Sequence, residues 1–337
     1  MLILLKPPRT ESDIIKHWKY TDRVYVSIIC PTFNQESYIE NALDGFLSQI
    51  TEYRFEIIVH DDASTDTTSS ILHRYKNKYP SLINIITQTE NQFSININMP
   101  FKHCLSISQG KYIALCEGDD FWCLNDKLQM QITELENNID YNIVISSAFG
   151  LSSDGTYSSF CDLGKNRFII PFKECILGPE KDFYPTASFL MRKDVLENLP
   201  DWFYSAPVGD YYLHVFCSFP NGCIYLPQKT VAYRIASIGS LSSMMNYDRF
   251  ITLRTKSYEC GFKLMDLYGY NYEFKKTILK KQARYLFEML VYAVKMKDFS
   301  SALKYIKNAF LVNPLSFLHI ALKYLKAKVL NFSVRKR

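Results

Sequence analysis

The sequence contains no run of about 18 uncharged apolar residues, which argues against a membrane-spanning helix. The apolar start MLILLK is too short for a signal peptide, because Pro7, Pro8 and Arg9 follow it at once. The nine cysteines are an odd number and include no CxxC pair. Several lie in apolar runs, as Cys30 and Cys116 do, where cysteine acts as a small hydrophobic residue. These absences argue against a disulfide framework or a zinc site and predict a cytoplasmic protein.

Most of the chain also lacks a basic charge excess. The net charge is +5, yet residues 295–337 hold ten Lys or Arg and one acid, a charge of +9. The remainder therefore carries −4, which argues against an extended basic groove and predicts no nucleic-acid partner. A length of 337 residues with 47% hydrophobic content predicts one large globular domain plus an appendage.

Strand and helix patterns alternate through the first 130 residues. The predicted strands are 24–30, 55–59, 82–86 and 112–116, and the predicted helices are 36–50, 66–79 and 99–109. This order predicts a doubly wound, mostly parallel α/β sheet, with ligands at the carboxyl ends of its strands. We expect a lead-in at 1–23, a catalytic domain at 24–248 and a helical C-terminal region at 249–337.

Polar residues follow the first predicted strand. Pro31, Thr32 and Asn34 stand there, although a turn alone would explain them. No GxGxxG motif occurs at this junction, so the chain lacks the phosphate cradle of a dinucleotide-binding fold.

Two adjacent acids, Asp61 and Asp62, end the second predicted strand. Their carboxylates could accept hydrogen bonds from a nucleotide base or from sugar hydroxyls. We expect them to bind ligand, and we expect Ser64 or Asp66 to cap the helix that follows.

The densest acidic cluster follows the fourth predicted strand, where Glu117, Asp119 and Asp120 are three acids in four residues. Such a cluster is unfavourable unless a cation offsets the repulsion. Oxygen ligands beside a nucleotide suit Mg²⁺ or Mn²⁺, which would act as a Lewis acid on a departing diphosphate. The alternative is an acidic loop that caps a helix beginning near Asn125.

Asp210 stands alone in the segment Gly209-Asp210-Tyr211-Tyr212. A sugar transfer that inverts configuration needs a base opposite the leaving group to take the proton of the acceptor hydroxyl. Asp210 could be that base, although a lone Asp at such a position is more often a helix cap.

Taken in order, these blocks resemble glycosyltransferase family 2, which has the GT-A fold. The matching segments are VSIICPTFNQESYIENALDGFLSQ (26–49), FEIIVHDDASTDTT (55–68), GKYIALCEGDDFWCLNDKLQMQ (110–131), YPTASFLMRKDVL (184–196) and PVGDYYLHVF (207–216). The resemblance spans roughly residues 24–245. It implies that Pro31, Thr32 and Asn34 line a nucleoside pocket and that Asp62, or Asp61, pairs with the base.

The resemblance also implies roles for the acidic residues. Glu117-Gly118-Asp119 stands where the family has its DxD motif, so Asp119 would bind the metal and Asp120 would lie beside the donor sugar. Asp210 falls in the block that holds the base of inverting members, and residues 186–188 would contact donor or acceptor.

The sequence departs from the family pattern in two places. Glu117 replaces the first Asp of DxD and reaches one methylene further. Ala236 stands where the family often has a His two positions after an arginine, here Arg234. Arg234 or a residue near Ser240 is then expected to supply the missing metal or diphosphate contact.

The segment 315–337 has an amphipathic pattern. One side carries Phe317, Leu318, Ala321, Leu322 and Leu325, and the other carries Lys323, Lys326 and Lys328, before Arg335, Lys336 and Arg337 end the chain. This pattern predicts a helix on an anionic membrane surface. The alternatives are a helix packed on the domain with a solvated basic face, or a basic tail that binds nucleic acid.

The leading hypothesis is an inverting hexosyl- or N-acetylhexosaminyl-transferase of surface-polysaccharide synthesis. It would use a nucleotide-diphosphate sugar, expected to be a UDP-sugar, and a glycan or lipid-linked saccharide as acceptor, at the inner face of the cell membrane. The alternative is a weak or inactive GT-A domain that binds nucleotide sugar or glycan. A third reading is a nucleic-acid binder that uses the basic tail.

Overall fold

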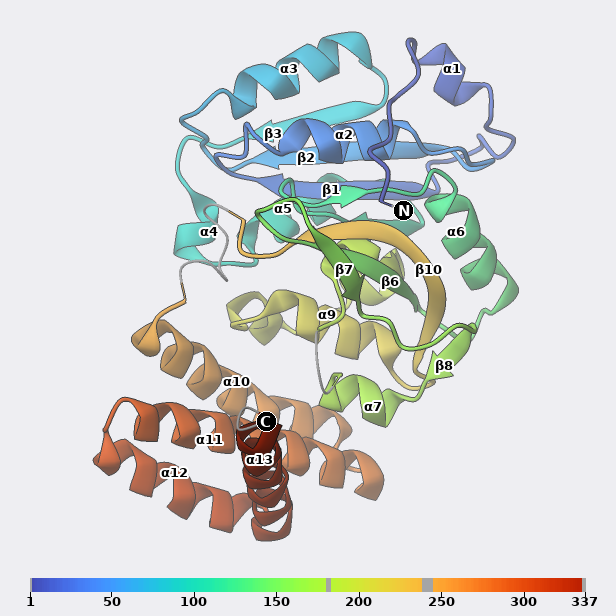
Figure 1. The fold of residues 1–337 in the computed structure, drawn as a ribbon. Coiled ribbons are helices and arrows are strands. Elements are labelled where there is room, and N and C mark those ends of the chain that lie inside the picture. The colour runs from blue at the N-terminus through green and yellow to red at the C-terminus, as the bar shows by residue number, and fades with distance from the viewer. Residues whose placement is uncertain (1, 180–182, 238–244, 335–337) are drawn as a thin grey trace. The chain divides into compact units, whose positions relative to one another are not determined.

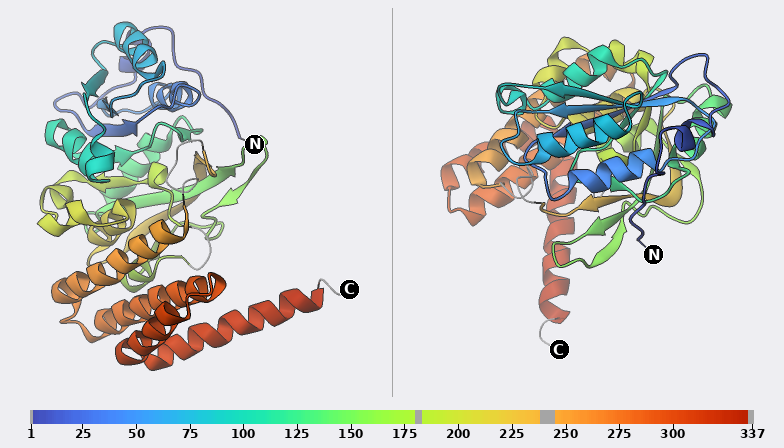
Figure 2. Two further views of the ribbon diagram at one scale, coloured as in Figure 1. Left: turned by 90° about the vertical axis from the view of Figure 1, so that its left-hand side faces the viewer. Right: turned by 90° about the horizontal axis from the view of Figure 1, so that it is seen from above.

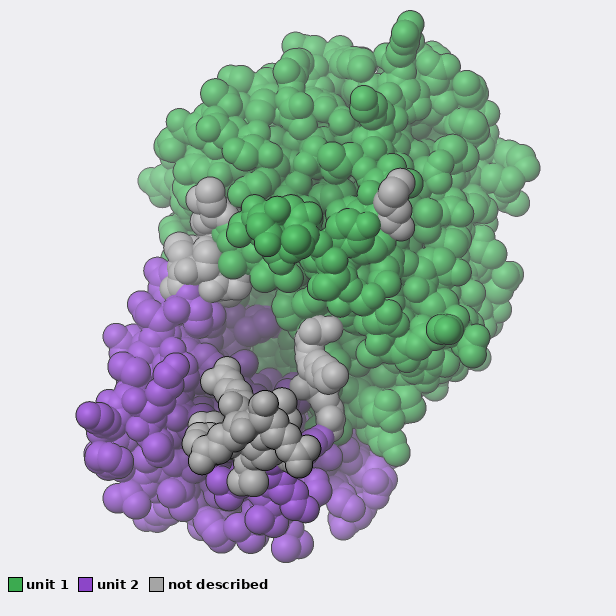
Figure 3. Space-filling view, viewed as in Figure 1, with its two compact units in different colours: residues 1–205, 209–244 green, residues 206–208, 245–337 purple. Residues whose placement is uncertain are grey.

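The computed structural model describes residues 2–179, 183–237 and 245–334. The chain divides into two compact units, coloured separately in Figure 3. Unit 1 comprises residues 1–205 and 209–244, and unit 2 comprises residues 206–208 and 245–337. Within the described part of the chain, no helix is both long and apolar enough to cross a membrane.

Unit 1 is built on a ten-stranded mixed sheet, which confirms the expected α/β fold (Figure 1). The strand order is β3-β2-β1-β4-β9-β6-β10-β5, with β7 beside β6 and β8 beside β10. The strands are β1 (Val26–Thr32), β2 (Phe55–Asp61), β3 (Ile83–Thr87), β4 (Tyr112–Leu115), β5 (Phe121–Trp122), β6 (Ile143–Leu151), β7 (Tyr157–Phe160), β8 (Phe168–Ile170), β9 (Leu190–Arg192) and β10 (Cys223–Arg234).

The strands β3, β2, β1 and β4 are parallel, as the alternation of strands and helices predicts. β2 is buried along its whole length because helices cover both faces of this part of the sheet. α2 (Ile39–Leu47) and α3 (Thr68–Lys78) lie on one face, and α5 (Met99–Ile107) lies on the other (Figure 2). β1 extends two residues beyond its predicted end, so Pro31 and Thr32 belong to the strand rather than to a turn.

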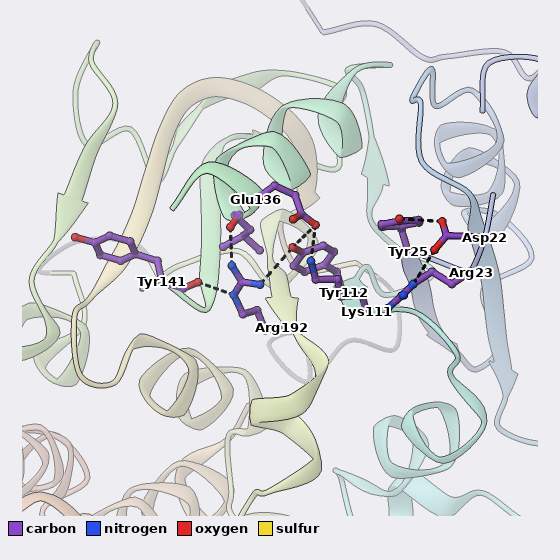
Figure 4. A network of polar contacts seen from close by, with 9 residues as sticks. Asp22, Arg23, Tyr25, Lys111, Tyr112, Glu136, Tyr141 and Arg192 are labelled. Carbon is purple, nitrogen blue, oxygen red and sulfur yellow. Dashed lines mark hydrogen bonds and ion pairs between the residues drawn. The ribbon is translucent and has the colours of Figure 1, made fainter. Parts of the chain in front are cut away.

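Beyond β4 the sheet is mixed, because β9 inserts antiparallel between β4 and β6. Arg192 of β9 lies opposite Tyr112 of β4 and donates to its hydroxyl (3.3 Å) and to the Tyr141 carbonyl (2.9 Å) (Figure 4). The Tyr112 hydroxyl donates in turn to Glu136, which also pairs with Lys111. This polar network holds β9 in its register.

The remaining helices of unit 1 have four to eleven residues. They are α1 (Ser12–Ile15), α4 (Gln92–Ile95), α6 (Lys127–Asn137), α7 (Phe172–Leu177), α8 (Lys193–Glu197) and α9 (Gly209–Ser218), with 3₁₀ turns at Thr186–Ser188 and Asp201–Ser205. All nine cysteines of the chain are buried, which agrees with their interpretation as small hydrophobic residues.

Unit 2, as far as it is described, is helical. Its helices are α10 (Tyr247–Tyr268), α11 (Tyr272–Lys295), α12 (Phe299–Val312) and α13 (Pro314–Val334). Each is preceded by an Asn or Asp whose side chain accepts a backbone N–H of the first turn, which marks the helix starts in the sequence. These capping residues are Asn246, Asn271, Asp298 and Asn313. α11 packs against the other three helices, around a core that includes Leu286, Phe287 and Ala309.

Candidate active site

Asn34 ties the loop after β1 to the loop after β2. Its backbone is left-handed (φ 51°), a conformation in which asparagine is enriched. Its N–H donates to the Ser64 hydroxyl (3.0 Å), and its side-chain oxygen accepts the N–H of Thr65 (2.7 Å). This residue, expected at the nucleoside, is therefore also a structural link between two loops.

Asp61 and Asp62 are almost fully buried at the end of β2, with 1% and 2% of their surface exposed. One oxygen of Asp61 accepts the N–H of Ser64 (3.1 Å). The two oxygens of Asp62 accept the N–H groups of Gln92 (2.7 Å) and Phe93 (2.9 Å), which begin α4. Both acids therefore hold the loops in place, and each Asp62 oxygen already has a backbone partner.

The N-cap residue of α3 is Thr67, so neither Ser64 nor Asp66 occupies the cap position, although the Asp66 side chain binds the start of the helix. The Asp66 carboxylate accepts the N–H of Thr68, the first residue of α3 (2.9 Å), and the N–H of Glu36 (3.1 Å). The Ser64 hydroxyl instead accepts the N–H of Asn34.

Gly118 allows the acidic loop after β4 to approach β1 closely. Its N–H donates to the Pro31 carbonyl (3.0 Å). A Cβ atom at Gly118 would lie 2.3 Å from the Gln35 side-chain oxygen and 2.8 Å from the Thr32 hydroxyl. The Thr32 hydroxyl itself donates to Gln35 (2.7 Å). Any larger residue at Gly118 would displace these contacts, a constraint that the sequence alone did not reveal.

Three carboxylates from distant parts of the chain come together in unit 1. Glu117 and Asp119 follow β4, and Asp210 lies in the first turn of α9. Burial, together with the nearby charges of Asp119 and Asp210, raises the pKa of Glu117 to about 8. Burial also raises the pKa of Asp210. The Thr186 hydroxyl contacts both Glu117 and Asp210, at 3.5 Å from the latter.

Asp120 faces the interior and is only 3% exposed. Burial, followed by the charges of Asp119 and Glu117, raises its pKa well above the ordinary carboxyl range. One of its oxygens accepts the N–H of Arg234 (2.8 Å). The Arg234 guanidinium donates to the Asp119 carbonyl and to the Asn41 side chain (2.7 Å). Arg234 therefore fastens the end of β10 to the acidic loop.

Ser237 is the residue that sequence reasoning missed. Ala236 before it is left-handed (φ 53°), and its methyl group offers no ligand atom. The Ser237 hydroxyl donates to the Asp119 carboxylate at 2.5 Å. The sequence pointed to Arg234 or to a residue near Ser240; Ser240 itself lies outside the described residues, and Ser237 stands three positions before it. The only available signal was the position of Ser237 three residues after Arg234.

These carboxylates suit Mg²⁺ or Mn²⁺, because both ions prefer oxygen ligands. Burial is the main cause of the raised pKa of Glu117, and repulsion by Asp119 and Asp210 adds to it; a nearby cation would relieve that repulsion. Across the described ranges, no group of three or more His, Cys, Asp or Glu side chains is arranged to hold a metal. The described part of the chain would then supply at most two such ligands, and diphosphate oxygens and water would complete the coordination.

Similar sequences include sugar transferases. An uncharacterized protein of Mycobacterium tuberculosis is 34% identical over 215 residues, which are 62% of this chain and 58% of that protein. The match therefore spans less than two thirds of that relative's length. The poly(ribitol-phosphate) beta-glucosyltransferase of Bacillus spizizenii is 30% identical over 161 residues, which are 47% of this chain and 25% of that enzyme.

Two solved structures share the fold at low sequence identity. The mannosyltransferase PcManGT of Pyrobaculum calidifontis, in complex with GDP-Man and Mn²⁺, gives a TM-score of 0.55 at 15% identity over 95% of this chain and 87% of that chain. Residues 1–349 of TarS from S. aureus, in complex with UDP-GlcNAc, give 0.54 at 14% identity over 82% of this chain and 89% of that chain.

The family model for glycosyl transferase family 2 matches residues 27–199, just over half of the chain. The matched stretch contains β1, β2 and β4, the loops that follow them, and Thr186. The chain belongs to glycosyl transferase family 2.

Proposed function

We propose that this glycosyltransferase moves a hexosyl or N-acetylhexosaminyl group from a nucleotide-diphosphate sugar to a glycan or lipid-linked saccharide, with inversion at the anomeric carbon. The observation that carries the proposal is the convergence of Glu117, Asp119 and Asp210 beside the loops after β1 and β2. We assign catalysis to residues 24–248.

The donor that we favour is a UDP-sugar. TarS, which has the same fold, is in complex with UDP-GlcNAc, whereas PcManGT is in complex with GDP-Man and Mn²⁺. We expect the nucleoside to lie against Pro31, Thr32 and Asn34, and its base to meet Asp61 or Asp62. The hydrogen bonds between these loops would hold the pocket in shape before the donor arrives.

The acidic loop would hold the diphosphate end of the donor. Asp119 would bind Mg²⁺ or Mn²⁺, with Glu117 close by and Asp120 next to the donor sugar. A divalent cation bound there would supply Lewis-acid chemistry, offsetting the charge that grows on the departing diphosphate.

Asp210 is our candidate for the general base. Burial raises its pKa and so makes its carboxylate a stronger base than that of an exposed Asp. The Thr186 hydroxyl, 3.5 Å from its carboxylate, would orient it. We expect the 3₁₀ turn at Thr186–Ser188 to contact donor or acceptor.

The apolar residues of α13 lie on two faces, which corrects the single apolar side expected from the sequence. Phe317 is 5% exposed and packs against Phe287 and Phe310, and Ala321 packs on the same core. The leucines at helical spacing that stay 45–80% exposed are Leu315, Leu318, Leu322 and Leu325.

The exposed leucine stripe is the surface that we propose for an anionic membrane. Its leucines would enter the headgroup boundary while Lys323 and Lys326, both exposed, meet anionic lipid. This would place the enzyme in the cytoplasm, at the inner face of the cell membrane, beside lipid-linked acceptors. Residues 335–337, which complete the basic tail, lie outside the described residues. The name of the Bacillus relative, a poly(ribitol-phosphate) beta-glucosyltransferase, supports a polymer as acceptor.

A paired substitution tests the membrane surface. Leu318→Ser with Leu322→Ser should weaken binding to vesicles that contain phosphatidylglycerol by roughly tenfold, because apolar burial drives the association. Cosedimentation measures the binding. Ile139→Ser, at an exposed apolar residue of unit 1, is the control and should bind as wild type does. Undiminished binding of the double variant would contradict the assignment.

Transfer itself is tested by nucleotide release from a panel of UDP- and GDP-sugars, with and without Mn²⁺, followed by NMR of the anomeric configuration of the product. We expect Mn²⁺-dependent release and inversion. Nucleotide binding without release on any donor would favour the alternative of a domain that binds but does not turn over. A product with retained configuration would exclude Asp210 as the base of a single displacement.

A further inference from the structure

The end of β10 is held beside the acidic loop by strand register. β10 pairs antiparallel with β5, so that Val231 lies opposite Trp122 and Ala232 opposite Phe121. Residues after Ala232 therefore run back alongside those before Phe121, which are the acidic loop. The backbone N–H of Arg234 donates to the Asp120 carboxylate at 2.8 Å, which this register allows.

The chain then turns so that Ser237 faces Asp119. The left-handed backbone of Ala236 (φ 53°) makes this turn. Ser237 is 6% exposed, and its hydroxyl lies 2.5 Å from one carboxylate oxygen of Asp119, Oδ2. The guanidinium of Arg234 donates to the backbone carbonyl of the same residue. Asp119 is thus held both at its backbone and at its side chain.

A hydroxyl–carboxylate bond of this length is a strong, charge-assisted hydrogen bond. It fixes the side-chain rotamer of Asp119, because rotation would leave the buried Ser237 hydroxyl without this partner. It also engages Oδ2, so that Oδ1, which has no hydrogen-bond partner among the residues that the structure describes, is the oxygen left to face a cation. Side chains that orient a metal ligand in this way commonly change metal affinity 10- to 100-fold when they are removed.

We propose that Ser237 is a positioning residue, which orients the Asp119 carboxylate for the divalent cation of the sugar-transfer site. The inference rests on the cation role given to Asp119 in the proposed function. The two Arg234 bonds hold the segment without help from Ser237, so loss of the Ser237 hydroxyl should affect the cation more than the fold.

The experiment is a titration of the full chain with Mn²⁺ in the presence of UDP. The EPR signal of free Mn²⁺ measures the binding, so the result does not depend on turnover. Ser237→Ala should weaken Mn²⁺ binding about tenfold or more. Ser237→Thr keeps the hydroxyl and should bind more tightly than Ser237→Ala. Ser106→Ala removes an exposed hydroxyl that bonds the His103 carbonyl and should bind as wild type does. Thermal unfolding of each variant checks that it is folded.

Wild-type affinity in Ser237→Ala, or equal losses in the Ala and Thr variants, would overturn the positioning role. A wild-type chain that transfers sugar without binding Mn²⁺ would also overturn the positioning role of Ser237. That result would not contradict the proposed sugar transfer. Conversely, Ser237-dependent Mn²⁺ binding in a chain that transfers no sugar would support the inference and contradict the proposed function.

Discussion

The loops after β1 and β2 and the acidic cluster after β4 lie side by side in unit 1 but satisfy their polar groups in opposite ways. In the loops, Asn34 and Asp62 give their side-chain oxygens to backbone N–H groups of neighbouring segments. In the cluster, Glu117, Asp119 and Asp210 converge, and burial, followed by the charges of Asp119 and Asp210, raises the pKa of Glu117 to about 8.

This difference distinguishes residues that stabilise the fold from residues that we expect to act in the reaction. Polar groups that are already paired with backbone stabilise the fold and define a shape. Carboxylates that repel one another make the site less stable than it would be with an added cation. We infer that the loops mainly define the shape of the donor pocket. The negative charge of the cluster would be neutralised by the cation that binds with the donor.

Asp210→Asn should have the largest effect, because the amide keeps the shape of the cluster but cannot take a proton. We expect the rate of transfer to fall by roughly 10²- to 10⁴-fold, with donor affinity little changed. Steady-state kinetics with the best donor of the panel measures this. Asp201→Asn, at an exposed acid of the neighbouring 3₁₀ turn, is the matched control. Near-normal transfer by Asp210→Asn would remove Asp210 as the base.

Asp62→Ala tests whether Asp62 stabilises the fold by binding backbone N–H groups. It leaves the N–H groups of Gln92 and Phe93 without their partners, and we expect a loss of roughly 1–3 kcal/mol in the free energy of unfolding. Denaturant unfolding measures it, with the exposed Asp140→Ala as control. If Asp62→Ala kept full stability but lost donor binding, Asp62 would belong to the ligand rather than to the scaffold.

The pH dependence of stability tests the acidic cluster. The pKa of Glu117 rises from an ordinary 4.5 to about 8 on folding, so the folded chain holds more protons than the unfolded chain between these values. Its contribution to stability is therefore greatest at low pH and is lost as the pH rises towards 8. Glu117→Gln should flatten this decline in thermal unfolding. An identical pH profile for the two proteins would contradict the raised pKa.

The sequence predicted the parallel half of the sheet well, because its strands are short apolar runs that end in polar residues. It did not predict the insertion of β9, which depends on contacts of Arg192 with residues far away in the chain. It also placed Phe317 and Leu318 on one side of a helix, since a pattern of apolar residues cannot distinguish a face packed on α11 from a face left exposed.

For the site, the sequence predicted the acidic residues but not the residues that form hydrogen bonds with them. Glu117, Asp119 and Asp210 were candidates because carboxylates at these positions suit cation and proton chemistry. Ser237 was not singled out by the sequence, because a serine hydroxyl is important here only through its 2.5 Å contact with Asp119. Asp62 looked like a ligand residue, and its two backbone partners in α4 appear only in three dimensions.

The most direct test of the account is sugar transfer by the wild-type chain and by Asp119→Ala, each with and without Mn²⁺. We expect Mn²⁺ to stimulate the wild type strongly and Asp119→Ala to lose most of its activity, by about 10³-fold, with no further response to Mn²⁺. Unchanged turnover in Asp119→Ala, with the same response to Mn²⁺, would contradict the claim that the acidic cluster works through a bound cation.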